Sequence, residues 1–184
     1  GFTTLNLTGS TDAIDLSDNS FTLTTLDLSA GTLSGTGTTT VTSAFTFSGA
    51  VLNSNLITGA VASTDLAHVS TVTISSGTWT NNGVVDWDGA SGDDFVVNGI
   101  FINASNGDFN IQTTNVNQNI RGTGLFDNQG DIFKTSGIGT HIDITTFDND
   151  GTVNVQSGAL LVNTDGTDNG NYIITGGATL DIGA

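Results

Sequence analysis

The sequence predicts an all-β protein, a parallel β-solenoid with little or no helix. Composition is the first reason: there are 25 Gly, no Pro, and 18 acidic residues that are all Asp, against one Lys and one Arg. Long helices are built from Ala, Leu, Glu, Lys and Arg, and the last three are nearly missing. Thr, Val, Ile, Asn, Asp and Gly dominate instead, and these residue types favour strands and turns.

A repeated unit is the second reason, and it is clearest in residues 147–162, FDNDGTVNVQSGALLV. Phe147 is followed by Asn149 and Gly151, and then by apolar residues at alternate positions. Alternation indicates a short strand with one buried face. Asn and Gly tolerate positive φ and indicate bends. The unit therefore consists of a bend, a short strand, a second bend and a second strand.

The spacing of this unit is the third reason. Its skeleton recurs at residues 79–87, 101–111, 126–132 and 169–174. The anchor glycines are separated by 24, 23, 21 and 19 residues; they are Gly83, Gly107, Gly130, Gly151 and Gly170. A period of this size is typical of a stacked solenoid, with roughly 20 residues per coil.

The N-terminal part is less regular but has the same character. Residues 4–8 and 23–28 alternate, and residues 31–49 continue with Thr-rich alternation. Residues 50–70 are less regular, and we expect a longer loop or a coil with an insertion there. The whole chain, 1–184, is interpreted as one solenoid domain. Its strand-like ends suggest a processed chain or a segment of a longer solenoid, whose end coils pair with neighbouring modules or with a second molecule.

The net charge of −16 narrows the classes of function. Without a basic patch the chain has nothing to bind nucleic-acid phosphates, and it is also unsuited to anionic membranes. No apolar run approaches the roughly 18 residues of a membrane-spanning helix. The acidity favours cation binding and solubility outside the cell.

Residues 25–184 resemble the degenerate β-helix repeats of very large secreted bacterial surface proteins, the adhesin-like and autotransporter-passenger-like solenoids. The segments that carry the resemblance are GTLSGTGTTTVTSAFTFSG, WTNNGVVDW, FDNQGDIFKTSGIGT, FDNDGTVNVQSGALLV and GNYIITGGATLDIGA. The resemblance implies a right-handed parallel β-helix that is exported, extracellular, and structural or adhesive. Asp127, Asp148 and Asp150 replace small polar residues and raise the acidity.

Calcium is the cofactor that the acidic clusters suggest. Residues 89–97 match the calcium nonapeptide G-G-x-G-x-D-x-U-x except at Ala90, although the motif occurs once only. Carboxylates and backbone carbonyls are the ligands that Ca²⁺ prefers. Asp165 and Asp168 form a weaker cluster. The alternative is that these residues are solvated bend residues. The candidate metal ligands are Asp86, Asp88, Asp93, Asp94, Asp148 and Asp150.

Catalytic signatures are weak. The two histidines, His68 and His141, lie in no recognisable motif, and His141 has the context of a plain strand residue. Arg121 and Lys134 are the only cationic residues that could serve a polysaccharide lyase. Lys134 occupies the position that Val155 holds in a later repeat, so either its side chain reaches solvent or the register shifts.

Three further patterns have structural explanations. Trp79 and Trp87 could stack on sugars but occupy core positions of the repeat. Thr38, Thr40 and Thr42 resemble an ice-binding row, but only one coil is Thr-regular. Asn6 and Asn103 begin glycosylation sequons.

We therefore expect an extracellular structural or adhesive solenoid, a segment of a surface fibre, stalk or biofilm matrix that self-assembles and is stabilised by calcium. The alternative is a β-helix that binds or cleaves an extracellular glycan.

Overall fold

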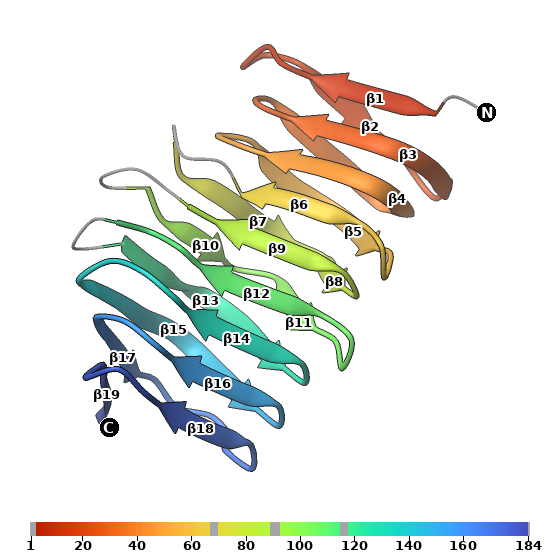
Figure 1. The fold of residues 1–184 in the computed structure, drawn as a ribbon. Helices are drawn as coiled ribbons and strands as arrows, with labels where there is room; N and C mark the ends of the chain where they lie inside the picture. The colour runs from red at the N-terminus through yellow and green to blue at the C-terminus, as the bar shows by residue number, and fades with distance from the viewer. Residues whose placement is uncertain (1–2, 67–69, 89–92, 115–117, 184) are drawn as a thin grey trace.

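The computed structural model describes residues 3–66, 70–88, 93–114 and 118–183. These residues form a β-solenoid of about eight turns with coils of about 21 residues, and no helix occurs among them (Figure 1). The strands are β1 (Thr4–Leu7), β2 (Ala13–Asp15), β3 (Phe21–Leu28), β4 (Thr32–Phe47), β5 (Val51–Thr58), β6 (Ser63–Leu66), β7 (Val72–Ser76), β8 (Thr78–Asn81), β9 (Val84–Trp87), β10 (Phe95–Val97), β11 (Ile100–Asn103), β12 (Asp108–Ile111), β13 (Gln118–Asn128), β14 (Asp131–Lys134), β15 (Gly139–Asn149), β16 (Thr152–Val155), β17 (Ala159–Asn163), β18 (Asn171–Ile174) and β19 (Thr179–Gly183).

Every strand pairing is parallel, and the pairings define three faces that run along the rod. Face A contains β1, β6, β9, β12, β14, β16 and β18, with the ends of β3 and β4. Face B contains β2, β7, β10, β17 and β19, with the first parts of β4, β5, β13 and β15. Face C contains β8 and β11, the start of β3, the middle of β4, and the ends of β5, β13 and β15. The longest strands therefore bend from one face to the next.

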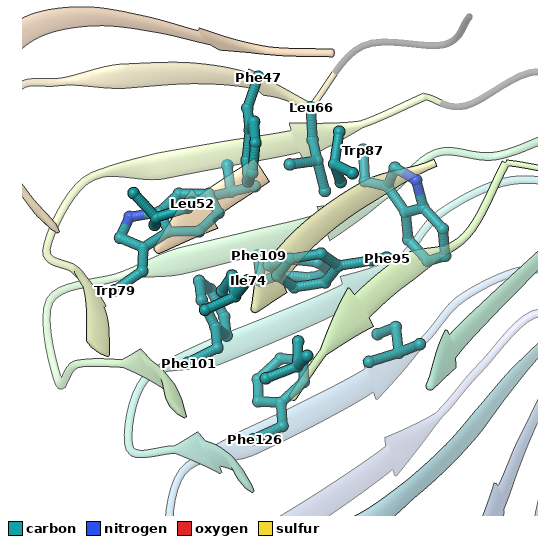
Figure 2. Packing of buried hydrophobic residues seen from close by; sticks show 14 of the residues in the cluster. Phe47, Leu52, Leu66, Ile74, Trp79, Trp87, Phe95, Phe101, Phe109 and Phe126 are labelled. Carbon is teal, nitrogen blue, oxygen red and sulfur yellow. The ribbon is translucent and has the colours of Figure 1, made fainter. Parts of the chain in front are cut away.

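The core is a continuous column of inward side chains (Figure 2). On face C, Trp79, Phe101, Phe126 and Phe147 occupy one stacked row, with ring centroids 4.9, 4.8 and 5.4 Å apart and rings nearly perpendicular. Edge-to-face packing is a favourable arrangement of aromatic rings. Trp79 is 0% exposed and Trp87 is 2% exposed, so the prediction that both are core residues is confirmed.

A ladder of buried asparagines runs beside the aromatic row. Asn81 donates from Nδ2 to Asn103 Oδ1 at 2.9 Å, Asn103 to Asn128 at 2.9 Å, and Asn128 to Asn149 at 2.8 Å. Thr58 donates to Asn81 at one end, and Asn149 donates to Asp168 at the other. Each amide therefore satisfies its neighbour inside a dry core, which is the only way that buried polar groups avoid a large desolvation cost.

The ladder bears on two features of the sequence, the glycosylation sequons and the bend asparagines. Asn103 is fully buried and bonded on both sides, so its amide is inaccessible to glycosylation in the folded chain. Asn6 is exposed. Asn81 accepts a hydrogen bond from the Gly83 amide at 3.1 Å, in an Asn-x-Gly bend where the repeat predicts one. The expected reason for the bend is wrong, because neither the ladder asparagines nor Gly83, Gly107, Gly130, Gly151 and Gly170 has a positive φ. Glycine is needed at position 83 because a Cβ there would lie 2.2 Å from the Ala62 carbonyl oxygen.

The described part of residues 50–70 contradicts the expected longer loop, because it forms a coil; residues 67–69 lie outside the described residues, so a coil with an insertion stays a prediction. Residues 51–58 form β5 and residues 63–66 form β6, both paired with coils on either side. Ser54, Thr58 and Thr64 point inward and are buried. Because these inward residues are polar, the sequence shows no apolar alternation here, and the two strands were not predicted.

Lys134 points inward without a shift in register. It pairs with Val155 as the repeat predicts, yet its side chain is 0% exposed, so the expectation that it reaches solvent or disrupts the register is wrong. The ammonium donates to the backbone carbonyl of Ser136. Burial lowers the pKa of Lys134 below its usual value, because desolvation disfavours the charged form.

Candidate functional site

The proposed calcium ligands lie on different faces of the rod. Asp86 points outward from face A on β9, where its Oδ1 accepts hydrogen bonds from Asn110 at 2.8 Å and Gln112 at 2.9 Å. Asp88 follows β9 and is exposed. Asp93 and Asp94 lead into β10 on face B. The glycine-rich part of the nonapeptide, residues 89–92, lies outside the described residues.

Asp94 has partners on both carboxylate oxygens. Oδ1 accepts hydrogen bonds from the Asn119 backbone amide at 2.9 Å and from its side-chain amide at 3.1 Å. Oδ2 forms an ion pair with Nε of Arg121. The side chain of Asp94 is 13% exposed and that of Arg121 is 50% exposed. A cation at Asp94 would have to compete with these donors.

Asp148 and Asp150 also act as structural acceptors. Asp148 lies on face C and accepts from the Thr167 amide at 2.7 Å and from the Thr167 hydroxyl at 3.0 Å. Asp150 lies at the bend and accepts from Asn169 at 3.0 Å. Both carboxylates therefore tie one coil to the next. Within the described part of the chain, no three Asp or His side chains gather closely enough to hold a metal ion. Calcium binding stays a prediction.

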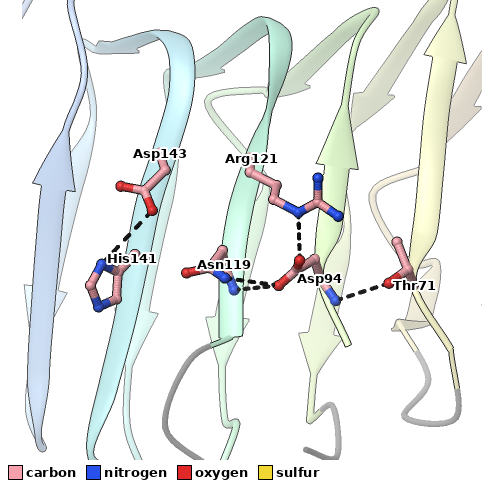
Figure 3. A network of polar contacts seen from close by, with 6 residues as sticks. All are labelled: Thr71, Asp94, Asn119, Arg121, His141 and Asp143. Atoms are coloured by element: carbon pink, nitrogen blue, oxygen red, sulfur yellow. Dashed lines mark hydrogen bonds and ion pairs between the residues drawn. The ribbon is translucent and has the colours of Figure 1, made fainter. Parts of the chain in front are cut away.

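Among the described residues, face B brings an arginine, a histidine and two carboxylates onto neighbouring strands, and we call this group the Arg121 network (Figure 3). Arg121 on β13 is in register with Asp143 on β15. His141 Nδ1 lies 3.8 Å from Asp143 Oδ2. The network is partly exposed, and its donors and acceptors bind one another rather than converging on an empty position. His68, the other histidine, lies outside the described residues.

Aligned carboxylates are a recurring electrostatic feature of face A. The parallel register places Asp108 of β12 beside Asp131 of β14, and Asp65 of β6 beside Asp86 of β9. Burial, and secondarily the charge of Asp131, raise the pKa of Asp108 above its usual value. At the end of the ladder, burial and the neighbouring Asp168 raise the pKa of Tyr172 to about 12.

A shallow groove of about 580 Å³ lies where faces B and C meet. Three stacked tripeptides line it, residues 76–78, 98–100 and 123–125, together with Thr146 and Asp148. Each tripeptide has a central glycine, so the floor of the groove is bare main chain. The groove was not predicted from the sequence, although three x-Gly-x tripeptides at successive coils, 76–78, 98–100 and 123–125, were a usable signal.

The ends of the rod are more open than its middle. In the first coils Leu5, Ile14 and Phe21 are only partly buried, whereas equivalent positions in the middle are fully buried. In the last coil, Ile174 is 46% exposed and Ile182 is 54% exposed. Stacking of a further coil would cover these side chains.

Among the described residues there is no helix long and apolar enough to cross a membrane. Comparison with models of protein families, with curated proteins and with solved structures found no match to this chain.

Proposed function

We propose that the chain is a structural and adhesive segment of an extracellular surface fibre, stalk or matrix protein. The observation that carries the proposal is the uninterrupted column of core side chains and bonded asparagines. Main-chain hydrogen bonds between parallel strands connect each coil to the next, and the ladder from Thr58 to Asp168 adds side-chain bonds between the coils that it crosses. Such a rod is suited to spacing and to bearing load, because extension along its axis must break many parallel hydrogen bonds together.

The use of polar residues supports the same proposal. Asp94, Asp148 and Asp150, which were candidate ligands, accept hydrogen bonds from the next coil. Both tryptophans, which were candidate sugar platforms, are in the core. These candidate ligand-binding side chains thus bond one coil to the next or pack in the core.

Self-assembly through the end coils is part of the proposal, with calcium as a stabilising ion. The partly exposed apolar side chains of the outer coils favour stacking of a second copy or of a neighbouring module of a longer chain. Electron microscopy of the purified chain in calcium, and then with a chelator, tests this. Filaments in calcium that disappear on chelation are expected. Short single rods in both conditions would remove self-assembly and calcium dependence and leave a passive spacer.

A second candidate is a β-helix that cleaves an extracellular polysaccharide, and the Arg121 network favours it. A half-exposed arginine between Asp94 and Asp143 could bind an acidic sugar and assist proton transfer. A viscosity or reducing-end assay with acidic polysaccharides tests this candidate. Activity that Arg121→Ala abolishes would establish it, and no activity toward any such polymer would dismiss it.

A further inference from the structure

The groove between faces B and C is built into the fold. A Cβ on Gly99 would lie 2.5 Å from the Gly77 carbonyl oxygen, and one on Gly124 would lie 1.9 Å from the Gly99 oxygen. Real side chains do not fit at such distances, so the coils can stack here only if these positions are glycine. These glycines let the main chains of successive coils approach closely, and the groove crosses those coils in the direction of the rod axis.

The chemistry of the groove differs from that of the rest of the surface. Its walls carry hydroxyl and amide groups at Ser76, Asn98 and Thr123, and aliphatic groups at Ile100 and Leu125. Asn98 Oδ1 accepts from the Thr123 amide at 3.1 Å and hydroxyl at 3.3 Å, and Ser76 donates to Asn53 Oδ1. A ligand would therefore use the remaining lone pairs of the two hydroxyl groups and the Nδ2 of Asn98. Asp148 is the only charged residue that lines it, in a chain with a net charge of −16. An anionic polymer would be repelled by the protein as a whole, and a cation would find a single carboxylate. The groove therefore suits an uncharged ligand.

The surrounding strands limit the shape of that ligand. β8 pairs with β5 on one side and β11 on the other, and β11 pairs with β8 and β13. Their main-chain groups are already bonded, so an extended peptide cannot add as another strand. The ligand must bind through side-chain hydrogen bonds and apolar contact along a line.

We propose that this groove binds a segment of a neutral, linear polysaccharide. Sugar hydroxyls would bond to Asn98, Thr123 and Ser76, and the C–H faces of the rings would lie against Ile100 and Leu125. Repeated coils present similar groups at intervals of about 4.8 Å, so successive sugars meet equivalent environments. The inference rests on the adhesive part of the proposed function and gives that adhesion a ligand class.

Affinity electrophoresis in gels that contain a soluble glycan tests the proposal. Hydroxyethyl cellulose, galactomannan and laminarin serve as neutral probes, and polygalacturonate serves as the acidic comparator. We expect retardation by at least one neutral glycan that is insensitive to salt, because no charges pair. Polygalacturonate should not retard the protein.

Variants locate the binding. Ile100→Asp places a charge in the groove, where the native side chain is 37% exposed, and should weaken binding on the order of tenfold. Val61→Asp makes the same charge change at a position that is 86% exposed and outside the groove lining, and should bind as the native chain does. Thr123→Val removes one hydroxyl and should weaken binding by a smaller factor. Circular dichroism confirms that each variant is folded.

Three results would overturn the proposal: no retardation by any neutral glycan, equal effects of Ile100→Asp and Val61→Asp, or salt-sensitive retardation by polygalacturonate alone. The last result would assign binding to the Arg121 network instead. Failure here is separable from failure of the rod proposal, because the microscopy of assembly does not depend on glycan binding.

Discussion

Substituting Asn128 by Ala tests whether the asparagine ladder stabilises the rod. The Asn128 side chain accepts from Asn103 and donates to Asn149. Truncation leaves the Asn149 oxygen without this donor and the Asn103 amide with fewer acceptors, in a region with no exposure to water. An unsatisfied buried polar group costs about 1–3 kcal/mol. With two affected neighbours and a small cavity, we expect a loss of about 2–5 kcal/mol in the free energy of unfolding.

Urea denaturation followed by circular dichroism measures this loss. Because solenoids do not always unfold in one step, the midpoint and the slope are compared together. The matched control is Asn171→Ala, because Asn171 is an exposed asparagine on face A; its effect should lie within about 0.5 kcal/mol. If Asn128→Ala were as stable as Asn171→Ala, the ladder would be a by-product of the stacking and the reasoning would fail.

Three further outcomes are expected. Gly151→Ala should strongly destabilise the chain, because the new Cβ would lie 2.0 Å from the Gly130 carbonyl oxygen. Gly139→Ala is the control and should be tolerated, because a Cβ there meets nothing within 4 Å. Similar thermal midpoints for the two variants would contradict the expected difference. Lys134→Met should raise stability at neutral pH by about 1–3 kcal/mol. Folding lowers the pKa of Lys134, so the unfolded chain binds more protons, and the free energy of unfolding should rise with pH up to about 10.5. Urea denaturation at a series of alkaline pH values should show this rise in the native chain. In Lys134→Met the part of the rise that comes from the lysine should be absent. Calcium should raise the thermal midpoint of unfolding if Asp86, Asp88, Asp93 and Asp94 bind it. A variant with all four replaced by Asn should not show this increase. An equal increase in the native chain and in the variant would exclude a calcium site at these residues.

The repeat was predictable where the inward positions were apolar or Asn. Phe101, Phe126 and Phe147 stand in the spacing that the structure uses, and the glycines that follow them occupy close approaches between coils. Residues 51–66 were not recognised because inward Ser54, Thr58 and Thr64 break the alternation. Thr58 bonds to Asn81 at the start of the ladder, whereas the hydroxyl groups of Ser54 and Thr64 are buried without a hydrogen-bond partner. A pattern within one coil reveals neither arrangement.

The candidate site was less predictable, because parallel stacking brings together residues about one coil apart. Asp94 and Arg121 are separated by 27 residues, and the sequence assigned Asp94 to its near neighbours Asp86 and Asp88. Local clusters of Asp are divided among faces and bends once the chain turns. The relevant neighbours of any residue are those roughly 21 positions away, and that offset varies from coil to coil.

The same stacking gives the acidity a physical consequence that needs no chelating site. Asp65 with Asp86, Asp108 with Asp131, and Asp127 with Asp148 lie in register on adjacent strands. Like charges on neighbouring strands repel and destabilise the sheet. Amide donors offset part of this repulsion at Asp86 and Asp148. At Asp108 burial is the main cause of the raised pKa, and the charge of Asp131 raises it further. Screening by salt relieves exposed pairs in general, so monovalent salt should stabilise the rod as well. A calcium-specific effect is therefore only the part of the stabilisation by calcium that remains at matched ionic strength.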